Sequence, residues 1–280
     1  MKIESEIAGK LWRIAIWALV GFFIINLTGI ILSVVVDSLG TSWFATWLPN
    51  GFTTSWYSES WSSFQLGGVL VVTLEVAGAV LIGSALLGVP AAYALARRDF
   101  PGKKLVMLLF VLPLIIPPFT YGIPLASVLY QFGLGGTLTG VILANLMPSV
   151  PFVIFILVPF IEQIDPRVEA AARVFGAGTW ALFRSVMVPL LLPGILAALV
   201  LVLVRTIGLF ELTFLTAGPG NQTLVVALYY SVFAAGMRAN QTIDAMAVIY
   251  MVTSLVCLII ALRFVDPTQI VGRSKKSAAH

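Results

Sequence analysis

Cysteine and histidine are nearly missing from this 280-residue sequence, which contains one of each. Cys257 lies in an apolar run and His280 is the last residue. A disulfide framework needs paired cysteines, and structural zinc sites draw on clustered cysteines and histidines. The sequence therefore excludes a disulfide scaffold, predicts no metal site, and offers no histidine suited to a serine–histidine catalytic triad.

Charged residues are also scarce, at 10% of the chain, where an average soluble domain has about 25%. Apolar residues make up 60%, and the mean hydropathy is +1.04. This composition is typical of an integral membrane protein and leaves little room for a soluble domain. We expect a single transmembrane domain that covers residues 1–280.

Motifs for chemistry are lacking too. No G-x-x-x-x-G-K-[ST] loop is present, and the nearest stretch, GRSKKS at Gly272–Ser277, has the wrong spacing to hold phosphates. We find no paired catalytic carboxylates and no nucleophile motif. The sequence therefore predicts no catalytic residues, no cofactor in this chain and no ATP hydrolysis by it.

Long apolar runs are what the sequence has in quantity. A transmembrane helix needs about 20 residues and a barrel strand about 10, so these long, uniformly apolar runs predict helices. We predict an all-α protein with six transmembrane helices, and we expect seven prolines to bend or break the third and fourth. The approximate limits are 11–36, 66–95, 105–130, 138–161, 188–216 and 243–265.

Lysine and arginine gather at alternate ends of these runs. If the helices alternate in direction, 14 of the 16 basic residues fall on one side of the membrane. The positive-inside rule then puts both termini in the cytoplasm. This topology explains the pI of about 9.3 without a nucleic-acid partner.

The segment 37–65, on the opposite side, contains four of the seven tryptophans. Tryptophan concentrates at membrane interfaces, so an aromatic belt or a lateral helix is the simpler interpretation. A docking surface for an outer partner is the alternative. The four residues are Trp43, Trp47, Trp56 and Trp61.

Residues 165–187, between the fourth and fifth runs, are mixed in character. Asp165 can cap a helix, and Pro166 suits a first helical position. Gly176 and Gly178 then interrupt the apolar face, and a second apolar stripe begins at Trp180. We predict a helix, a glycine turn and a second helix at the inner interface. An amphipathic helix resting on lipid would explain the stripe but not the turn.

The stretch EAAARVFGAGTWALFRSVMVPLLLPGI, from Glu169 to Ile195, resembles the EAA loop of permease subunits of binding-protein-dependent ABC importers with the type I (MetI-like) fold. That pattern is E-A-A, three residues, Gly-Ala, and a proline thirteen residues beyond the glycine. Ala170 holds the glutamate position and Glu169 precedes it, so we expect the acidic contact to be shifted or lost. The matching residues are Ala171, Ala172, Gly176, Ala177, Trp180, Phe183, Pro189, Pro193 and Gly194.

The resemblance implies a bacterial inner-membrane, multi-pass permease that forms half of a translocation pathway for a small hydrophilic solute. Residues 165–187 would be a cytoplasmic coupling loop that docks on an ATPase. The implied partners are a second permease subunit, two ATPase subunits that bind ATP and Mg²⁺, a solute-binding protein and the lipid bilayer, with no nucleic acid. The implied coupling residues are Glu169, Ala171, Ala172, Gly176, Ala177 and Phe183.

Three ionisable residues lie inside predicted helices, where an uncompensated charge costs about 2.5–3.5 kcal/mol. Arg205 and Glu211 are candidates to line the translocation path, and Asn145 is a further candidate. Glu75 is either a path residue or a structural partner of Arg205, because both are predicted at a similar depth. Amides more often join helices than bind solutes.

Two alternatives and the cargo remain open in the sequence. A secondary transporter could use Glu75 or Glu211 as an ion site, and a sugar importer would share the same loop. The stretch Trp47–Trp61 resembles permeases for polyamines, opines, phosphonates or ferric iron more than those for sugars.

Overall fold

The computed structural model describes residues 2–43, 48–233 and 239–264, and its side chains are described from residue 9 onward. Several residues named in the sequence analysis lie outside these ranges: Trp47, residue 265 at the end of the predicted sixth span, and the terminal Arg273, Lys275 and Lys276. Within the described ranges the regular secondary structure is helical apart from one isolated β-bridge between Gly40 and Phe52. The chain forms two compact units, one from residues 1–64 and 231–249 and the other from 65–230 and 250–280.

Within the described ranges, five helical segments are long and apolar enough to cross a membrane. A sixth is counted if two bent helices form one span, so the prediction of an all-helical membrane protein is confirmed. The predicted ends of the spans lie within three residues of the observed helix ends, except that α1 begins at Lys2 instead of residue 11 and α9 ends at Gly208 instead of residue 216. The long helices are α1 (Lys2–Leu39), α3 (Leu66–Arg97), α6 (Leu138–Glu162), α9 (Val188–Gly208) and α12 (Asn240–Leu262).

The predicted third span is broken into α4 (Lys103–Ile115) and α5 (Pro118–Gln131), which meet at 103°. Ile116 and Pro117 have extended backbones with ψ near 134° and 135°. A residue before proline is driven out of the helical region, so two successive prolines end one helix and begin another. The fourth span differs, because α6 remains one continuous helix although it contains Pro148, Pro151 and Pro159.

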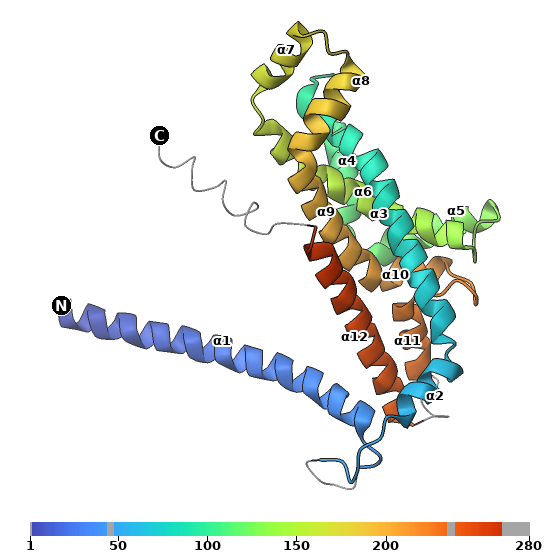
Figure 1. The fold of residues 1–280 in the computed structure, drawn as a ribbon. Coiled ribbons are helices and arrows are strands. Elements are labelled where there is room, and N and C mark those ends of the chain that lie inside the picture. Colours follow the sequence, from blue (N-terminus) through green and yellow to red (C-terminus); the bar gives the residue numbers. More distant parts are fainter. Residues whose placement is uncertain (1, 44–47, 234–238, 265–280) are drawn as a thin grey trace. The chain divides into compact units, whose positions relative to one another are not determined.

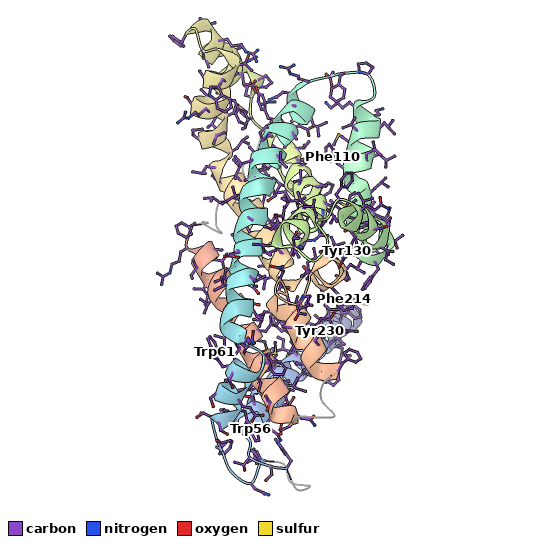
Figure 2. The ribbon with its side chains drawn as sticks, turned by 90° about the vertical axis from the view of Figure 1, so that its right-hand side faces the viewer. Trp56, Trp61, Phe110, Tyr130, Phe214 and Tyr230 are labelled. Atoms are coloured by element: carbon purple, nitrogen blue, oxygen red, sulfur yellow. The ribbon has the colours of Figure 1, made fainter. Side chains whose placement is uncertain are left out.

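The predicted fifth span, 188–216, ends early. Leu209 is extended after Gly208 and separates α9 from the short α10 (Phe210–Thr216). A further helix, α11 (Leu224–Phe233), was not predicted, because ten apolar residues are too few to span a bilayer. The rings of Phe214 in α10 and Tyr230 in α11 lie side by side, 5.8 Å apart (Figure 2).

The core of the larger unit lies where α3, α6 and α9 pack against one another (Figure 1). Val76 and Val80 of α3 are buried together with Leu157 of α6 and Val202 of α9. Small residues allow helices in membranes to approach closely. Gly88 shows this, since a Cβ atom at this position would lie 2.7 Å from a methyl carbon of Val153 in α6.

The smaller unit contains α1, α2 (Ser55–Ser63) and the beginning of α12. The Trp56 indole donates to the Gly40 carbonyl oxygen at 2.7 Å, and the Ser60 hydroxyl donates to the Thr242 carbonyl oxygen at 3.0 Å. Trp61 is half exposed. A short helix bearing two of the four tryptophans is therefore present, as one interpretation of the segment 37–65 predicted.

We predict that Gly88→Val lowers the melting temperature of the purified protein, because overpacking a close helix contact costs about 1–3 kcal/mol. Gly78→Val is the matched control, since Gly78 lies in the same helix with no atom within 4 Å of its added Cβ. Thermal unfolding in detergent measures both variants. Equal melting temperatures for the two would show that α3 and α6 do not depend on this contact.

Candidate functional site: the coupling segment

Residues 165–187 form the predicted helix, glycine turn and helix. The Asp165 carboxylate accepts a hydrogen bond from the Arg167 backbone N–H at 2.8 Å and caps α7 (Pro166–Val174). Gly176 turns the chain with φ of +85°, a conformation that favours glycine. The chain then continues through α8 (Thr179–Leu182) and the π-helical turn η1 (Phe183–Met187) directly into α9. The second helix is thus the first part of one membrane-crossing segment, Thr179–Gly208.

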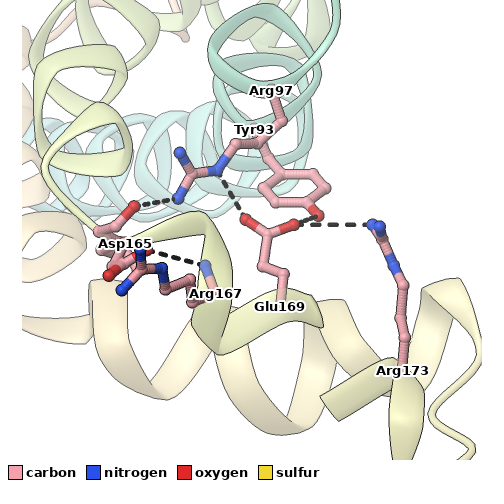
Figure 3. A network of polar contacts seen from close by, with 7 residues as sticks. Tyr93, Arg97, Asp165, Arg167, Glu169 and Arg173 are labelled. Carbon is pink, nitrogen blue, oxygen red and sulfur yellow. Dashed lines mark hydrogen bonds and ion pairs between the residues drawn. The ribbon is translucent and has the colours of Figure 1, made fainter. Parts of the chain in front are cut away.

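The Glu169 carboxylate is the centre of a polar network at the end of α3 (Figure 3). Its side chain is 7% exposed. One oxygen accepts from Arg97 Nε at 2.6 Å and the other from the Tyr93 hydroxyl at 2.7 Å. Arg97 also donates to the Ile164 carbonyl oxygen at 2.6 Å, and Arg173 Nη2 lies 3.7 Å from Glu169. We call Glu169, Arg97 and Tyr93 the Glu169 network.

This network joins α7 to the transmembrane helix α3. A buried carboxylate is tolerated where opposite charge and hydrogen-bond donors compensate for lost water, and Arg97 and Tyr93 provide both. The shifted acidic residue therefore has a full set of partners inside its own chain. The sequence analysis used Arg97 only as an orientation signal and missed Tyr93. Their four-residue spacing, which puts both on one face of α3, was the available signal.

Three apolar side chains project from the turn, and we call Val174, Phe175 and Trp180 the apolar tip. Their exposed fractions are 84%, 91% and 71%. Phe183 behaves differently, because it packs inward with its ring 5.4 Å from that of Tyr93. The other predicted coupling residues line the turn: Ala171 and Gly176 are exposed, whereas Ala172 and Ala177 are half-buried.

The predicted pair between Glu75 and Arg205 is not formed, which corrects that interpretation. Glu75 is exposed and makes no ion pair in the described residues, whereas its neighbour Val76 faces the core. Arg205 instead lies 5.4 Å above the ring centre of Phe152 in α6. Counting residues along two helices does not show which side of each helix faces the other.

Asn145 is fully buried between α6 and α10. Its amide nitrogen donates to the Val141 carbonyl oxygen at 2.8 Å and to the Thr213 hydroxyl at 3.1 Å. The contact with Thr213 ties the short helix α10 to the long helix α6. In the described protomer Asn145 is therefore a joint between helices.

Glu211 lies in the first turn of α10 and is half-buried. The charges of Glu211 and Arg205 both act on the Tyr121 hydroxyl of α5, which is buried and makes no hydrogen bond within the described residues. Two of the four predicted path residues are thus near one another, together with a tyrosine that the sequence analysis missed. No group of three or more potential metal ligands occurs in the described ranges.

Residues 84–271 match the family described as "Binding-protein-dependent transport system inner membrane component". The match covers well over half of the chain. This chain belongs to that family.

Relatives and solved structures agree with this assignment. The chain is 32% identical over 206 residues to the molybdenum transport system permease protein ModB of Haemophilus influenzae, which covers 68% of this chain and 89% of the relative. It is 35% identical over 150 residues to the diacetylchitobiose uptake system permease protein NgcG of Streptomyces coelicolor, covering 54% of this chain and 50% of that relative. The chain thus spans only half the length of NgcG.

A crystal structure of a bacterial ABC transporter involved in the import of the polysaccharide alginate has the same fold. Its TM-score is 0.73 at 16% identity, with 91% of this chain and 96% of the other covered.

The permease is therefore a multi-pass inner-membrane component of an ABC importer and is not itself an enzyme. Members of the family carry no cofactor, and ATP is bound by the ATPase partner. The importer also includes a binding protein. An ion-coupled transporter working alone, the alternative that the sequence left open, is wrong.

We predict that Glu169→Gln makes α7 open more readily, because a hydrogen-bonded charge contributes about 2 kcal/mol. Hydrogen exchange of residues 166–175 should accelerate in this variant. Asp99→Asn is the control, because it removes the exposed ion pair between Asp99 and Lys103, where Asp99 is 99% exposed. Unchanged exchange in the Glu169 variant would contradict the role of the network.

Proposed function

We propose that this chain forms one half of the translocation pathway of the importer and that residues 165–187 are the loop on which its ATPase acts. The observation that carries the proposal is the arrangement of Glu169 and Phe175 in one short segment. Glu169 fixes the segment to α3, while Phe175 projects away with 91% of its surface exposed. The segment is thus attached to α3 through Glu169, while Phe175 is exposed for binding to the ATPase.

The apolar tip is suited to insertion into a protein groove. Aromatic residues are enriched among the side chains that dominate binding energy, and they act by filling pockets. The neighbouring Arg167, Arg173 and Arg184 favour a position outside the hydrocarbon, on the cytoplasmic side. An apolar tip surrounded by arginines is better explained by a protein partner than by lipid.

The segment is connected to two helices of the core. The Glu169 network connects α7 to α3, and the π-helical turn connects α8 to α9. Phe183 links α3 with α8, because its ring packs against the rings of both Tyr93 in α3 and Trp180 in α8. A force on the apolar tip is therefore transmitted to α3 and α9 together, and both pack on α6.

The remaining features of the assembly follow from this role. We take both termini to be cytoplasmic, the whole of residues 1–280 to be one permease domain, and the complete importer to contain a second permease subunit and two ATPases. Arg205 in α9, Glu211 in α10 and Tyr121 in α5 are the proposed path residues of this half. Asn145 and Glu75 are weaker candidates, because Asn145 is fully buried and Glu75 is exposed and makes no ion pair within the described residues.

For the cargo we favour a small oxyanion. The similarity to the molybdenum permease covers 89% of that relative, and molybdenum(VI) in water is the molybdate dianion. Arg205 provides a cation beside the unpartnered Tyr121 hydroxyl, although Glu211 offsets its charge. Polyamines, opines, phosphonates, ferric iron and sugars are the alternatives that the sequence raised.

We predict that Phe175→Ser lowers the amount of ATPase that co-purifies with the permease by about tenfold or more, because loss of an aromatic anchor costs about 2 kcal/mol or more. Phe132→Ser is the matched control, since Phe132 is 77% exposed but lies outside the coupling segment. Quantitative gels of the purified complex measure the ratio. A normal ratio in the Phe175 variant would remove the apolar tip from the docking surface.

We predict that molybdate or sulfate raises the melting temperature of the importer's binding protein, whereas spermidine and disaccharides leave it unchanged. A ligand present at about 1,000 times its Kd stabilises the folded state by about 4 kcal/mol, which a thermal shift detects readily. Of the same panel, molybdate or sulfate should be taken up into proteoliposomes in an ATP-dependent manner, whereas spermidine and disaccharides should not. A shift with spermidine alone would overturn the oxyanion assignment without affecting the coupling role.

A further inference from the structure

A cavity of about 560 Å³ lies between the end of α3 and the coupling segment. Its wall combines residues from three helices. Arg97 and Arg98 come from the end of α3, Glu169 and Arg173 from α7, and Thr179 from the start of α8. The cavity adjoins the Glu169 network but is not filled by it.

The charges that line this cavity do not balance. Three arginines face one carboxylate, and that carboxylate already accepts from Arg97 and Tyr93. Arg98 makes no ion pair or side-chain hydrogen bond within the part of the chain that the structure describes. Arg173 has only the 3.7 Å contact with Glu169 and is 61% exposed. Two guanidinium groups therefore remain available to a ligand.

We propose that this arginine cavity binds a phosphate group, held mainly by Arg98 and Arg173. Guanidinium groups present several N–H donors in a planar fork that matches phosphate oxygens, and such charge-assisted hydrogen bonds are among the strongest in proteins. Thr179 lines the same cavity, and its hydroxyl would add a neutral donor. A carboxylate would satisfy fewer of these donors than a phosphate.

The position of the cavity favours the phosphate of an anionic phospholipid. The candidate membrane span in α3 ends at Arg97, and we therefore place Arg98, just beyond that end, beside the headgroups. Basic pockets at the cytoplasmic ends of transmembrane helices bind such headgroups. This step rests on the proposed function, which puts the coupling segment on the cytoplasmic side. Free phosphate has the same chemistry and is the other possible source.

A bound phosphate would strengthen the attachment of the coupling segment. Arg98 belongs to the end of α3 and Arg173 to α7, so one anion between them would join the same two helices that Glu169 joins. The apolar tip would remain free for the ATPase, because Phe175 is almost fully exposed outside the cavity. The lipid composition of the membrane would then affect how strongly α7 is attached to α3.

The test compares the full-length permease in nanodiscs of phosphatidylcholine with and without phosphatidylglycerol, using native mass spectrometry to count retained phosphatidylglycerol. Arg98→Gln and Arg173→Gln should lower retention about tenfold, the effect of losing one charge-assisted hydrogen bond. Arg184→Gln is the matched control, because Arg184 is an exposed arginine of the same segment that does not line the cavity. Arg98→Lys keeps the charge without the fork and should give an intermediate loss.

A second arm titrates inorganic phosphate into the delipidated permease by calorimetry. Binding that depends on Arg98 and Arg173, without selective retention of phosphatidylglycerol, would support the site with free phosphate as its source. No binding in either arm, or an equal loss in Arg184→Gln, would overturn the proposal. Release of the lipid when the ATPase assembles would also overturn it, because the ATPase would then fill the cavity. Failure of the wild-type permease to retain an ATPase would refute the coupling role alone.

Discussion

The buried carboxylate of Glu169 is the constraint on which the coupling segment depends. With only 7% of its side chain exposed, this charge keeps its compensation only while Arg97 and Tyr93 of α3 remain in contact with it. If α7 moved away alone, Glu169 would lose its hydrogen bonds from Arg97 and Tyr93, and a hydrogen bond to a charged group contributes about 1.5–3 kcal/mol. A displacement of α7 is therefore coupled to a displacement of α3. An exposed helix attached only by its loops would have no such requirement.

The packing of the larger unit determines how far such a displacement extends. At Gly88 the absence of a side chain lets α3 approach Val153 of α6 so closely that an added Cβ atom would lie 2.7 Å from it. The segment after Gly176 is also continuous with α9, so α3 and α9 are both moved by the turn. The extended residue Leu209 interrupts this continuity before α10, and Asn145 ties α10 to α6 instead. The long helices and α10 can therefore respond differently to the same force.

The sequence predicts those parts of this fold that depend on neighbouring residues. Apolar runs about as long as a bilayer is thick gave the spans, and Asp165 with Gly176 gave both ends of α7. The partners of Glu169 lie 72 and 76 residues away, so the sequence can place Tyr93 and Arg97 on one face of α3, but only the tertiary structure shows that they bind Glu169. The hypothesis of a pair between Glu75 and Arg205 failed for the same reason, because depth can be counted along a chain but the face that a helix turns to its neighbour cannot.

The two adjacent arginines at the end of α3 have different roles, because α3 ends between them. Arg97 is the last helical residue, and its helical position directs its guanidinium into the contact with Glu169, where it is 14% exposed. Arg98 is the capping residue with an extended backbone at φ −114° and ψ 136°, so its side chain leaves the direction of the helix face. Helical residues one position apart already point about 100° apart, and the extended backbone changes this direction further. Ending α3 between these residues gives one guanidinium to the network and leaves the other for the cavity, which explains why a single carboxylate does not neutralise both.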